Sequence, residues 1–189
     1  MSGPKILSER ERAFEEVFFR KESERLVEAM RERKSRQENF DALSAALGVD
    51  SPAVIDSLLD LGVREENVTA LMLAPMVAVA WADHTIHPNE RRSILKAEHD
   101  LGIAPDSQAG ELLAMWLEFR PHESLLDTWS AYVGELCENL GPDERTRLRD
   151  DTVARAGGVA RAFEKTFLRA HGPTDEEKAV LQRIEAAFP

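Results

Sequence analysis

The amino-acid sequence predicts an all-α protein, a compact helical bundle with an N-terminal helical prefix. Apolar residues recur three and four positions apart along most of the chain, and no long stretch alternates with the period of two typical of a β-strand. Proline stands at the start of several of these segments and glycine at the end of several, as is usual for helices. We expect the prefix over residues 5–62 and the helical domain over residues 66–189.

The first predicted helix is long and amphipathic. Ser8 and Glu11 form a Ser-x-x-Glu capping box, and a helical stripe that begins at Phe14 continues to about Arg36. The helix has more apolar surface than a solitary solvated helix should expose, on Phe14, Val17, Phe18, Phe19, Leu26, Val27 and Met30. We therefore favour a monomer in which this helix docks on its own bundle, and the alternative is a dimer formed through it.

Two short helices and one central helix follow. The short helices are expected over residues 40–47, ended by Gly48, and over residues 51–61, ended by Gly62. The central helix, over residues 65–83, is apolar on almost every side, which predicts burial among other helices. Pro75 removes one of its backbone hydrogen bonds and predicts a kink. The residues expected in its core are Leu71, Met72, Met76, Val79 and Ala80.

Four more helices are expected between the turn at residues 84–89 and the last segment of the chain. Each opens near a proline, namely Pro88, Pro105, Pro121 and Pro142. Gly102 should end the first of them. The fourth should reach about residue 170, with a kink, a break or a close helix contact at Gly157 and Gly158, because each glycine costs about 1 kcal/mol relative to alanine.

The last segment repeats the spacing of an earlier one. Residues 76–95, MVAVAWADHTIHPNERRSIL, and residues 169–188, RAHGPTDEEKAVLQRIEAAF, both read as a helix, a tight turn and a second helix with glutamate at its third position. Placing Glu177 beside Glu90 also aligns Thr174 with His87. Two such pseudo-repeated hairpins could pack as pseudo-symmetric halves around one core.

Residues 82–90, Ala-Asp-His-Thr-Ile-His-Pro-Asn-Glu, resemble the motif of the TerB-like, tellurite-resistance-associated family. That all-α family has the pattern Ala-Asp-Gly-x-[Val/Ile]-x-x-x-Glu between two helices, and His84 stands here in place of its glycine. The resemblance covers about residues 66–189. It implies that Asp83 and Glu90 belong to an acidic surface that contacts a divalent metal or a partner. In the second hairpin only Glu177 corresponds, because residues 170–172 lack the aspartate.

A second resemblance lies in the prefix, over about residues 8–60. Residues 10–18, RERAFEEVF, are similar to the opening of the small helical zeta-type inhibitor of bacterial F1-ATPases. Residues 45–59, AALGVDSPAVIDSLL, are compatible with the later helices of that inhibitor. This resemblance implies an alternative function, an ATPase-inhibitory helical protein that acts through its N-terminal helix.

Asp83, His87, Glu90 and Glu177 are the candidate metal ligands. Histidines and carboxylates three and four residues apart around a turn, His84 included, can supply two or three donors to a divalent ion. Helix capping explains Glu90 and Glu177 without an ion, because each lies three residues after a plausible N-cap. We therefore expect the turn to be primarily a structural connector, with weak metal binding at most and no other cofactor.

Composition narrows the functional classes. The 24 Lys and Arg against 35 Asp and Glu give a net charge of −11, which argues against a nucleic-acid or anionic-membrane partner. The only cysteine, Cys137, allows no internal disulfide and fits a reduced cytoplasm. The longest apolar run, residues 70–82, falls short of the roughly 20 residues that cross a bilayer. No nucleophile elbow, phosphate-binding glycine loop or His-Glu-x-x-His helix occurs. We expect a non-enzymatic cytoplasmic interaction or stress-associated module whose protein partner is unknown.

Overall fold

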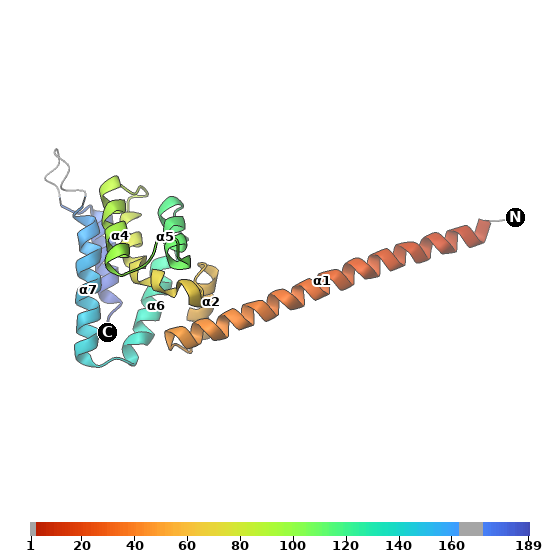
Figure 1. Ribbon diagram of the computed structural model, residues 1–189, viewed down its shortest axis with the longest axis horizontal. Helices are drawn as coiled ribbons and strands as arrows, with labels where there is room; N and C mark the ends of the chain where they lie inside the picture. The colour runs from red at the N-terminus through yellow and green to blue at the C-terminus, as the bar shows by residue number, and fades with distance from the viewer. Residues whose placement is uncertain (1–2, 163–171) are drawn as a thin grey trace. The chain divides into compact units, whose positions relative to one another are not determined.

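The computed structural model describes the backbone of residues 3–162 and 172–189 and the side chains of residues 20–162 and 172–189. Within these ranges every regular element is a helix, so the all-α prediction is confirmed (Figure 1). The chain divides into two compact units, Met1–Asp41 and Ala42–Pro189, and each is considered by itself.

The described residues of the first unit form a single helix. Helix α1, Gly3–Leu47, begins before the predicted cap at Ser8 and continues into the second unit. The prediction that the helix ends near residue 36 and a new one begins near residue 40 is wrong, because α1 is continuous there. No proline or glycine interrupts residues 5–47. Leu26, Val27 and Met30 are exposed, and the aromatic part of the stripe, residues 14–19, lies outside the described side chains. Docking of the stripe therefore stays a prediction.

The second unit contains the end of α1 and the other helices that the structure describes. These are α2 Pro52–Asp60, the 3₁₀ helix η1 Glu65–Leu73, α3 Ala74–Ala80, α4 Pro88–Asp100, α5 Gln108–Glu118, α6 Leu125–Glu138, α7 Pro142–Ala160 and α8 Asp175–Ala186. Residues 42–62, expected in the prefix, belong to this unit and contribute to its core. Leu43, Ile55 and Leu58 are fully buried there.

The segment predicted as one central helix is divided into two. Residues 65–73 form the 3₁₀ helix η1, and α3 starts only at Ala74. Pro75 lies in the first turn of α3, where its missing N–H costs no helical hydrogen bond, so the helix starts there instead of kinking. Leu71, Met76, Val79 and Ala80 are buried as expected, but Met72 is 49% exposed. The three-residue period of η1 turns it away from the core.

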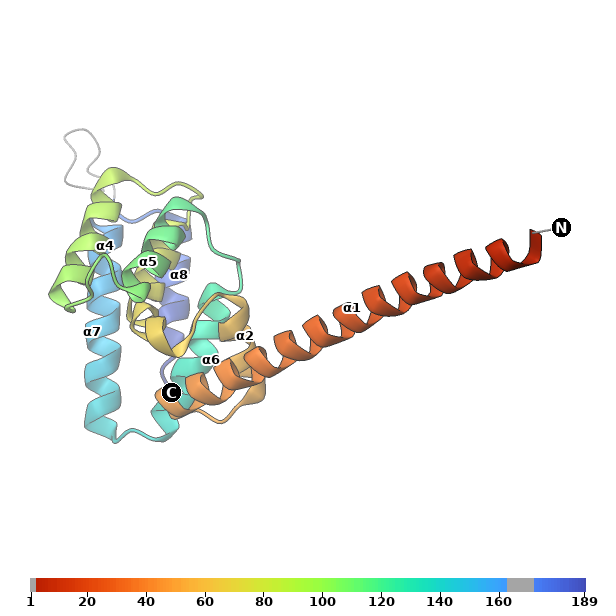
Figure 2. The same ribbon diagram turned by 45° about the vertical axis from the view of Figure 1, so that its right-hand side comes forward.

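Helix α3 lies at the centre of the second unit. It packs against η1, α4, α6, α7 and α8. Helix α7 also packs against α4 and α8, and Figure 2 shows these helices side by side. Helices α5 and α2 complete the unit by packing on η1 and α6 respectively. The central position of α3 explains why its residues from Ala74 to Val77 are all buried.

Some of the predicted helix ends are confirmed and others are displaced. Helix α4 starts at Pro88, and Gly102 follows it with a φ of +72°, a left-handed conformation suited to glycine. Helices α5 and α6 begin at Gln108 and Leu125, later than the expected prolines. At the start of α5 the Ser107 Oγ accepts a hydrogen bond from the Gly110 N–H at 3.2 Å, which caps the helix.

Helix α7 runs unbroken through Gly157 and Gly158, so neither a break nor a kink is needed there. Gly157 is buried together with Ala156, Val159 and Ala160, and α7 packs against α3. The close helix contact predicted at the glycines is not found, because a Cβ atom at Gly157 would first meet Arg161 at the end of the same helix and one at Gly158 would meet nothing within 4 Å. The predicted continuation of the helix to about residue 170 lies outside the described residues, which stop at residue 162 and resume at 172.

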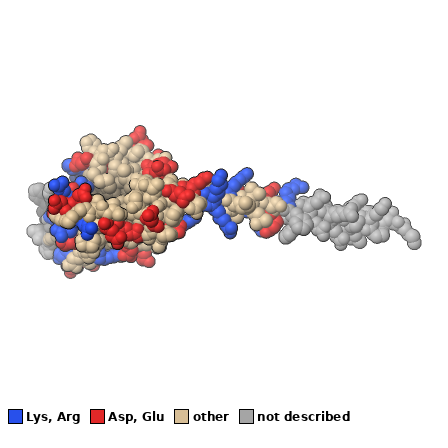
Figure 3. Space-filling model, turned by 90° about the horizontal axis from the view of Figure 1, so that it is seen from below, with Lys and Arg blue, Asp and Glu red and all other residues tan. Residues whose placement is uncertain are grey.

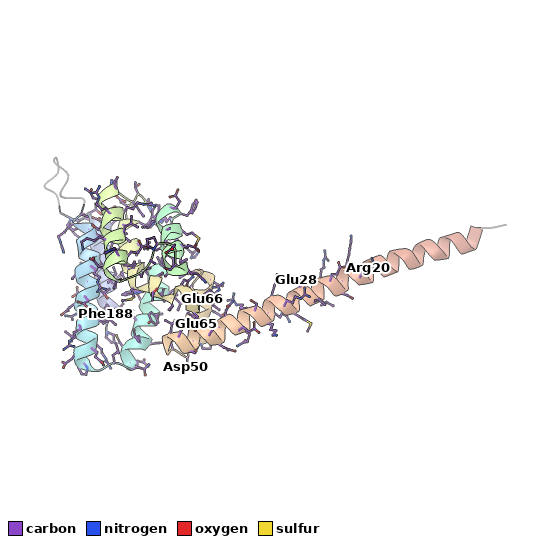
Figure 4. All side chains as sticks on the ribbon, viewed as in Figure 1. Arg20, Glu28, Asp50, Glu65, Glu66 and Phe188 are labelled. Carbon is purple, nitrogen blue, oxygen red and sulfur yellow. The ribbon has the colours of Figure 1, made fainter. Side chains whose placement is uncertain are left out.

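Acidic side chains are exposed at many positions of the second unit. Figure 3 shows acidic side chains distributed over the face of this unit turned to the viewer. Glu65 and Glu66, labelled in Figure 4, are exposed at the start of η1. Their negative charges interact favourably with the positive end of the helix dipole there. In the described part of the chain no single helix is long and apolar enough to cross a membrane, and residues 20–47 with α2 pass that test only as a bent pair.

Candidate functional site: a buried glutamate pair

Glu90 lies in the first turn of α4, and its side chain turns back to the start of the helix. The backbone N–H of His87 donates a hydrogen bond to Oε2 of Glu90 at 2.7 Å. This bond satisfies a backbone donor at the helix start that has no partner within the helix. The predicted capping role of Glu90 is therefore confirmed. Only 3% of this residue is exposed, which capping alone does not require.

Glu177 occupies the same position in α8. The backbone N–H of Thr174 donates to Oε2 of Glu177 at 2.6 Å, and the Thr174 Oγ1 accepts from the Glu177 N–H at 3.1 Å. These two reciprocal bonds form the complete capping box that the sequence predicted. Glu177 is 5% exposed, so it is buried as deeply as Glu90.

The two glutamates are in contact with each other. Their side chains form a hydrogen bond between carboxyl groups, which joins the start of α4 to the start of α8. A carboxyl group donates such a bond only when it is protonated, and the raised pKa of Glu90 makes Glu90 the donor at neutral pH.

Burial is the main reason that the pair keeps its proton. Desolvation raises the pKa of Glu90 from its ordinary value of 4.5 to about 8. The hydrogen bond from His87 opposes this rise, while the Glu177 hydrogen bond and the charges of Glu177 and Asp83 reinforce it.

The turn before α4 surrounds the pair with polar groups. Asp83 is exposed, its Oδ1 accepts from the Thr85 N–H at 3.0 Å, and its Oδ2 lies 3.7 Å from His87 Nε2. His84 has a φ of +71°, the left-handed conformation that glycine adopts without strain. The glycine of the TerB-like pattern would fit that backbone. His84 points to another neighbour, because Arg120 donates to its Nδ1 at 2.6 Å.

The predicted metal ligands come together only in part. Glu90 and Glu177 are hydrogen-bonded, and Asp83 is close enough to act on the charge of Glu90 and to pair with His87. In the ranges that the structure describes, however, no group of three or more His, Cys, Asp or Glu side chains is arranged to hold a metal ion. Glu90 and Glu177 direct their carboxyl groups to each other and to backbone donors.

Two contacts at this site were not predicted. The Glu90–Glu177 hydrogen bond was missed because capping explained each glutamate within its own hairpin. The shared spacing of the two hairpins was the available signal, since it places Glu90 and Glu177 at equivalent positions of the two segments. The contact between His84 and Arg120 had no sequence signal, because the two residues are distant in the chain and follow no common pattern.

The fold and the site together define a helical-bundle protein in which a buried acid pair joins the starts of two helices. No family model, curated protein or solved structure matches the chain. The TerB-like and zeta-type resemblances therefore depend on their sequence motifs alone.

Proposed function

We propose that this chain is a non-enzymatic cytoplasmic interaction or stress-associated module of the TerB-like type. Its acidic hairpin face, defined as Asp83, Asp175 and Glu176, contacts a basic protein partner or a cation. The observation that supports this most directly is the contact between Glu90 and Glu177. Because that contact joins the starts of α4 and α8, the exposed acids of both turns lie at the same end of the unit.

The hydrogen bonds of the buried glutamates and the pKa of the buried cysteine support an interaction module over an enzyme. Both glutamates of the pair are occupied by hydrogen bonds to the backbone and to each other. Cys137 is fully buried, and burial raises the pKa of its thiol, which is the opposite of an activated nucleophile. The exposed acids, by contrast, are available to solvent: the side chain of Asp175 is 94% exposed, although it pairs with Lys178.

Binding of a lysine-rich peptide to the acidic hairpin face tests the protein-partner proposal. Fluorescence anisotropy should show binding that weakens when Asp83→Asn, Asp175→Asn and Glu176→Gln are combined. The matched control removes three other exposed negative charges, through Asp50→Asn, Glu65→Gln and Glu66→Gln. Equal weakening by both triple variants would reduce the effect to net charge and would count against a defined face.

Titration of metal-free protein with zinc, manganese and calcium tests the cation proposal. We expect binding weaker than micromolar, because Glu90 and Glu177 are committed to hydrogen bonds and Asp83 and His87 remain as the local donors. Micromolar or tighter binding that is lost in Asp83→Ala or Glu90→Ala would show that the turn is a metal site and overturn its assignment as a connector.

The structure of α1 supports a second candidate, inhibition of F1-ATPase. The backbone of α1 is helical throughout residues 8–36, and Leu26, Val27 and Met30 are exposed on it, where apolar side chains are accessible to a partner. Adding the full chain to purified F1-ATPase would then reduce turnover. The inhibition should disappear when residues 1–36 are deleted and weaken in the doubly substituted Leu26→Lys, Met30→Lys protein. Undiminished turnover with the full chain would exclude this function.

A further inference from the structure

The second unit contains an apolar cavity that is separate from the glutamate pair. Its volume is about 320 Å³, and it lies among the end of α1, η1, α6 and α7. Leu71, Trp129 and Val133 form its floor, and each is only 3% exposed. The volume is at the lower end of the range of about 300–1,000 Å³ typical of small-molecule sites, and it is too small for a partner helix.

Trp129, in the floor of the cavity, is held in place before any ligand binds. The Trp129 ring packs edge-on against the Phe188 ring, with centroids 5.9 Å apart and planes at 70°. Such an arrangement is favourable for aromatic pairs and fixes the orientation of the indole. A ligand that packs on Trp129 therefore does not have to order that side chain, which removes part of the entropic cost of binding.

Polar groups capable of binding an anion also line this cavity. Among the described residues that line the cavity, Arg155 of α7 is the only charged one; it is half-buried, and it forms no ion pair with any of the described side chains. Asp151, one turn earlier on α7, is exposed and forms no ion pair with Arg155 in the described part of the chain. Tyr132 is also half-buried, and burial raises the pKa of its hydroxyl, which therefore stays a neutral donor.

We propose that this cavity binds a small anionic amphiphile, a medium-chain carboxylate whose head group pairs with Arg155 and Tyr132 and whose apolar chain packs on Leu71, Trp129 and Val133. A guanidinium binds a carboxylate with two parallel hydrogen bonds, and partial burial strengthens them. A neutral apolar ligand would leave the Arg155 charge partly desolvated without a partner. The excess negative charge of the chain, −11 overall, would repel anions from most of the remaining surface. This inference does not depend on the acidic hairpin face.

Calorimetric titration of the full chain with sodium decanoate, kept below its micellar concentration, tests the proposal. Decanoate should bind saturably with one molecule per chain, and Arg155→Met should weaken this binding about tenfold or more, the loss expected for a charge-assisted hydrogen bond. Arg147→Met provides the matched control, because Arg147 is exposed on the same helix and does not line the cavity. Decanol, which has the same chain and no charge, should bind Arg155→Met at least as tightly as the wild type, because the substitution removes a charge that decanol leaves desolvated without a partner.

A second variant locates the ligand independently of charge. Thr152 lines the cavity and is half-buried, so Thr152→Phe should fill part of the space and weaken decanoate and decanol alike. Circular dichroism establishes that each variant folds, and Tyr132→Phe replaces Arg155→Met should the latter not fold. The proposal is overturned by the absence of saturable decanoate binding, by equal weakening in both arginine variants, or by binding that Thr152→Phe leaves unchanged.

Discussion

The carboxyl groups of Glu90 and Glu177 are hydrogen-bonded to each other, although one belongs to the start of α4 and the other to the start of α8. Each also accepts a hydrogen bond from the backbone of its own helix start. One proton therefore serves two helices that are far apart in the sequence. Removing that proton places two negative charges in contact inside the core. The free energy of unfolding should therefore decrease as the pH rises and the proton is lost.

The folded protein should lose stability as the pH rises from about 5 to 8. The pKa of Glu90 is about 8 in the folded state against an ordinary value of 4.5, so in this window the folded chain holds more protons than the unfolded chain. The stabilisation is complete below 4.5 and is lost as the pH rises through 8. Urea denaturation at a series of pH values should show the unfolding free energy falling by up to about 1.4 kcal/mol per pH unit.

Glu90→Gln tests whether the glutamate pair causes the pH dependence of stability. The glutamine amide can donate to Glu177 at any pH, so this variant should lose much of the pH dependence and exceed the wild type in stability above pH 8. Burial also raises the pKa of Glu98, but its contribution is common to both proteins and cancels in their difference. Glu144→Gln is the control, because Glu144 caps α7 through the Gly141 N–H at 2.9 Å while remaining exposed. An unchanged slope in Glu90→Gln would contradict the shared proton.

Removal of one member of the pair should cost more than loss of a helix cap. Glu177→Ala deletes the bond to the Thr174 N–H and leaves the buried Glu90 without its side-chain partner. We expect a loss of about 2–3 kcal/mol, made up of a cap and an unsatisfied buried group. Glu144→Ala should cost about 1 kcal/mol or less, since that cap is exposed. Equal losses in the two variants, measured by urea denaturation, would mean that the contact with Glu90 contributes nothing.

His84 should be a site where glycine stabilises the protein relative to alanine. Both His84→Gly and His84→Ala remove the imidazole that accepts from Arg120, so their difference reports the backbone alone. At a φ of +71°, alanine is strained and glycine is not, which predicts that the glycine variant is more stable by about 1 kcal/mol. A more stable alanine variant would show that the turn relaxes to another conformation. The measurement is again urea denaturation.

The protein should behave as a monomer of 21.2 kDa in solution. Light scattering coupled to size-exclusion chromatography measures this mass without reference to shape. A mass that doubles with concentration would contradict the expectation. The combined Leu26→Lys and Met30→Lys variant would then identify the interface, because both side chains are exposed on α1 and should restore the monomer only if they form the contact.

Local chemistry made much of the fold predictable. Pro88 and Pro142 marked helix starts correctly, and Gly48, Gly62 and Gly102 all adopt the left-handed conformation that ends helices. The 3₁₀ form of η1 was not predictable in this way, because apolar residues on all sides of a segment do not specify its helical period. The start of α5 was also missed: a proline can begin a turn as readily as a helix, and Ser107 is the residue that caps it.

The candidate site was predictable residue by residue but not as a contact. The position of Glu90 three residues after His87, and of Glu177 three after Thr174, predicted both capping bonds. Burial of these side chains depends on how α3 brings α4 and α8 together, and this is a tertiary relationship. The cavity beside Arg155 is likewise formed by four separate segments of the chain. Neither arrangement produces a local sequence pattern that would predict it.

Folding of this protein also takes up a proton from the solvent, because of the glutamate pair. At neutral pH an unfolded chain has both glutamates ionised, so each molecule that folds withdraws a proton from the buffer and each that unfolds returns it. The heat absorbed on thermal unfolding near pH 7 therefore includes the heat of protonating the buffer. That heat is large for Tris and small for phosphate. Two calorimetric scans at the same pH should consequently give different enthalpies, and their difference counts the protons that the fold holds.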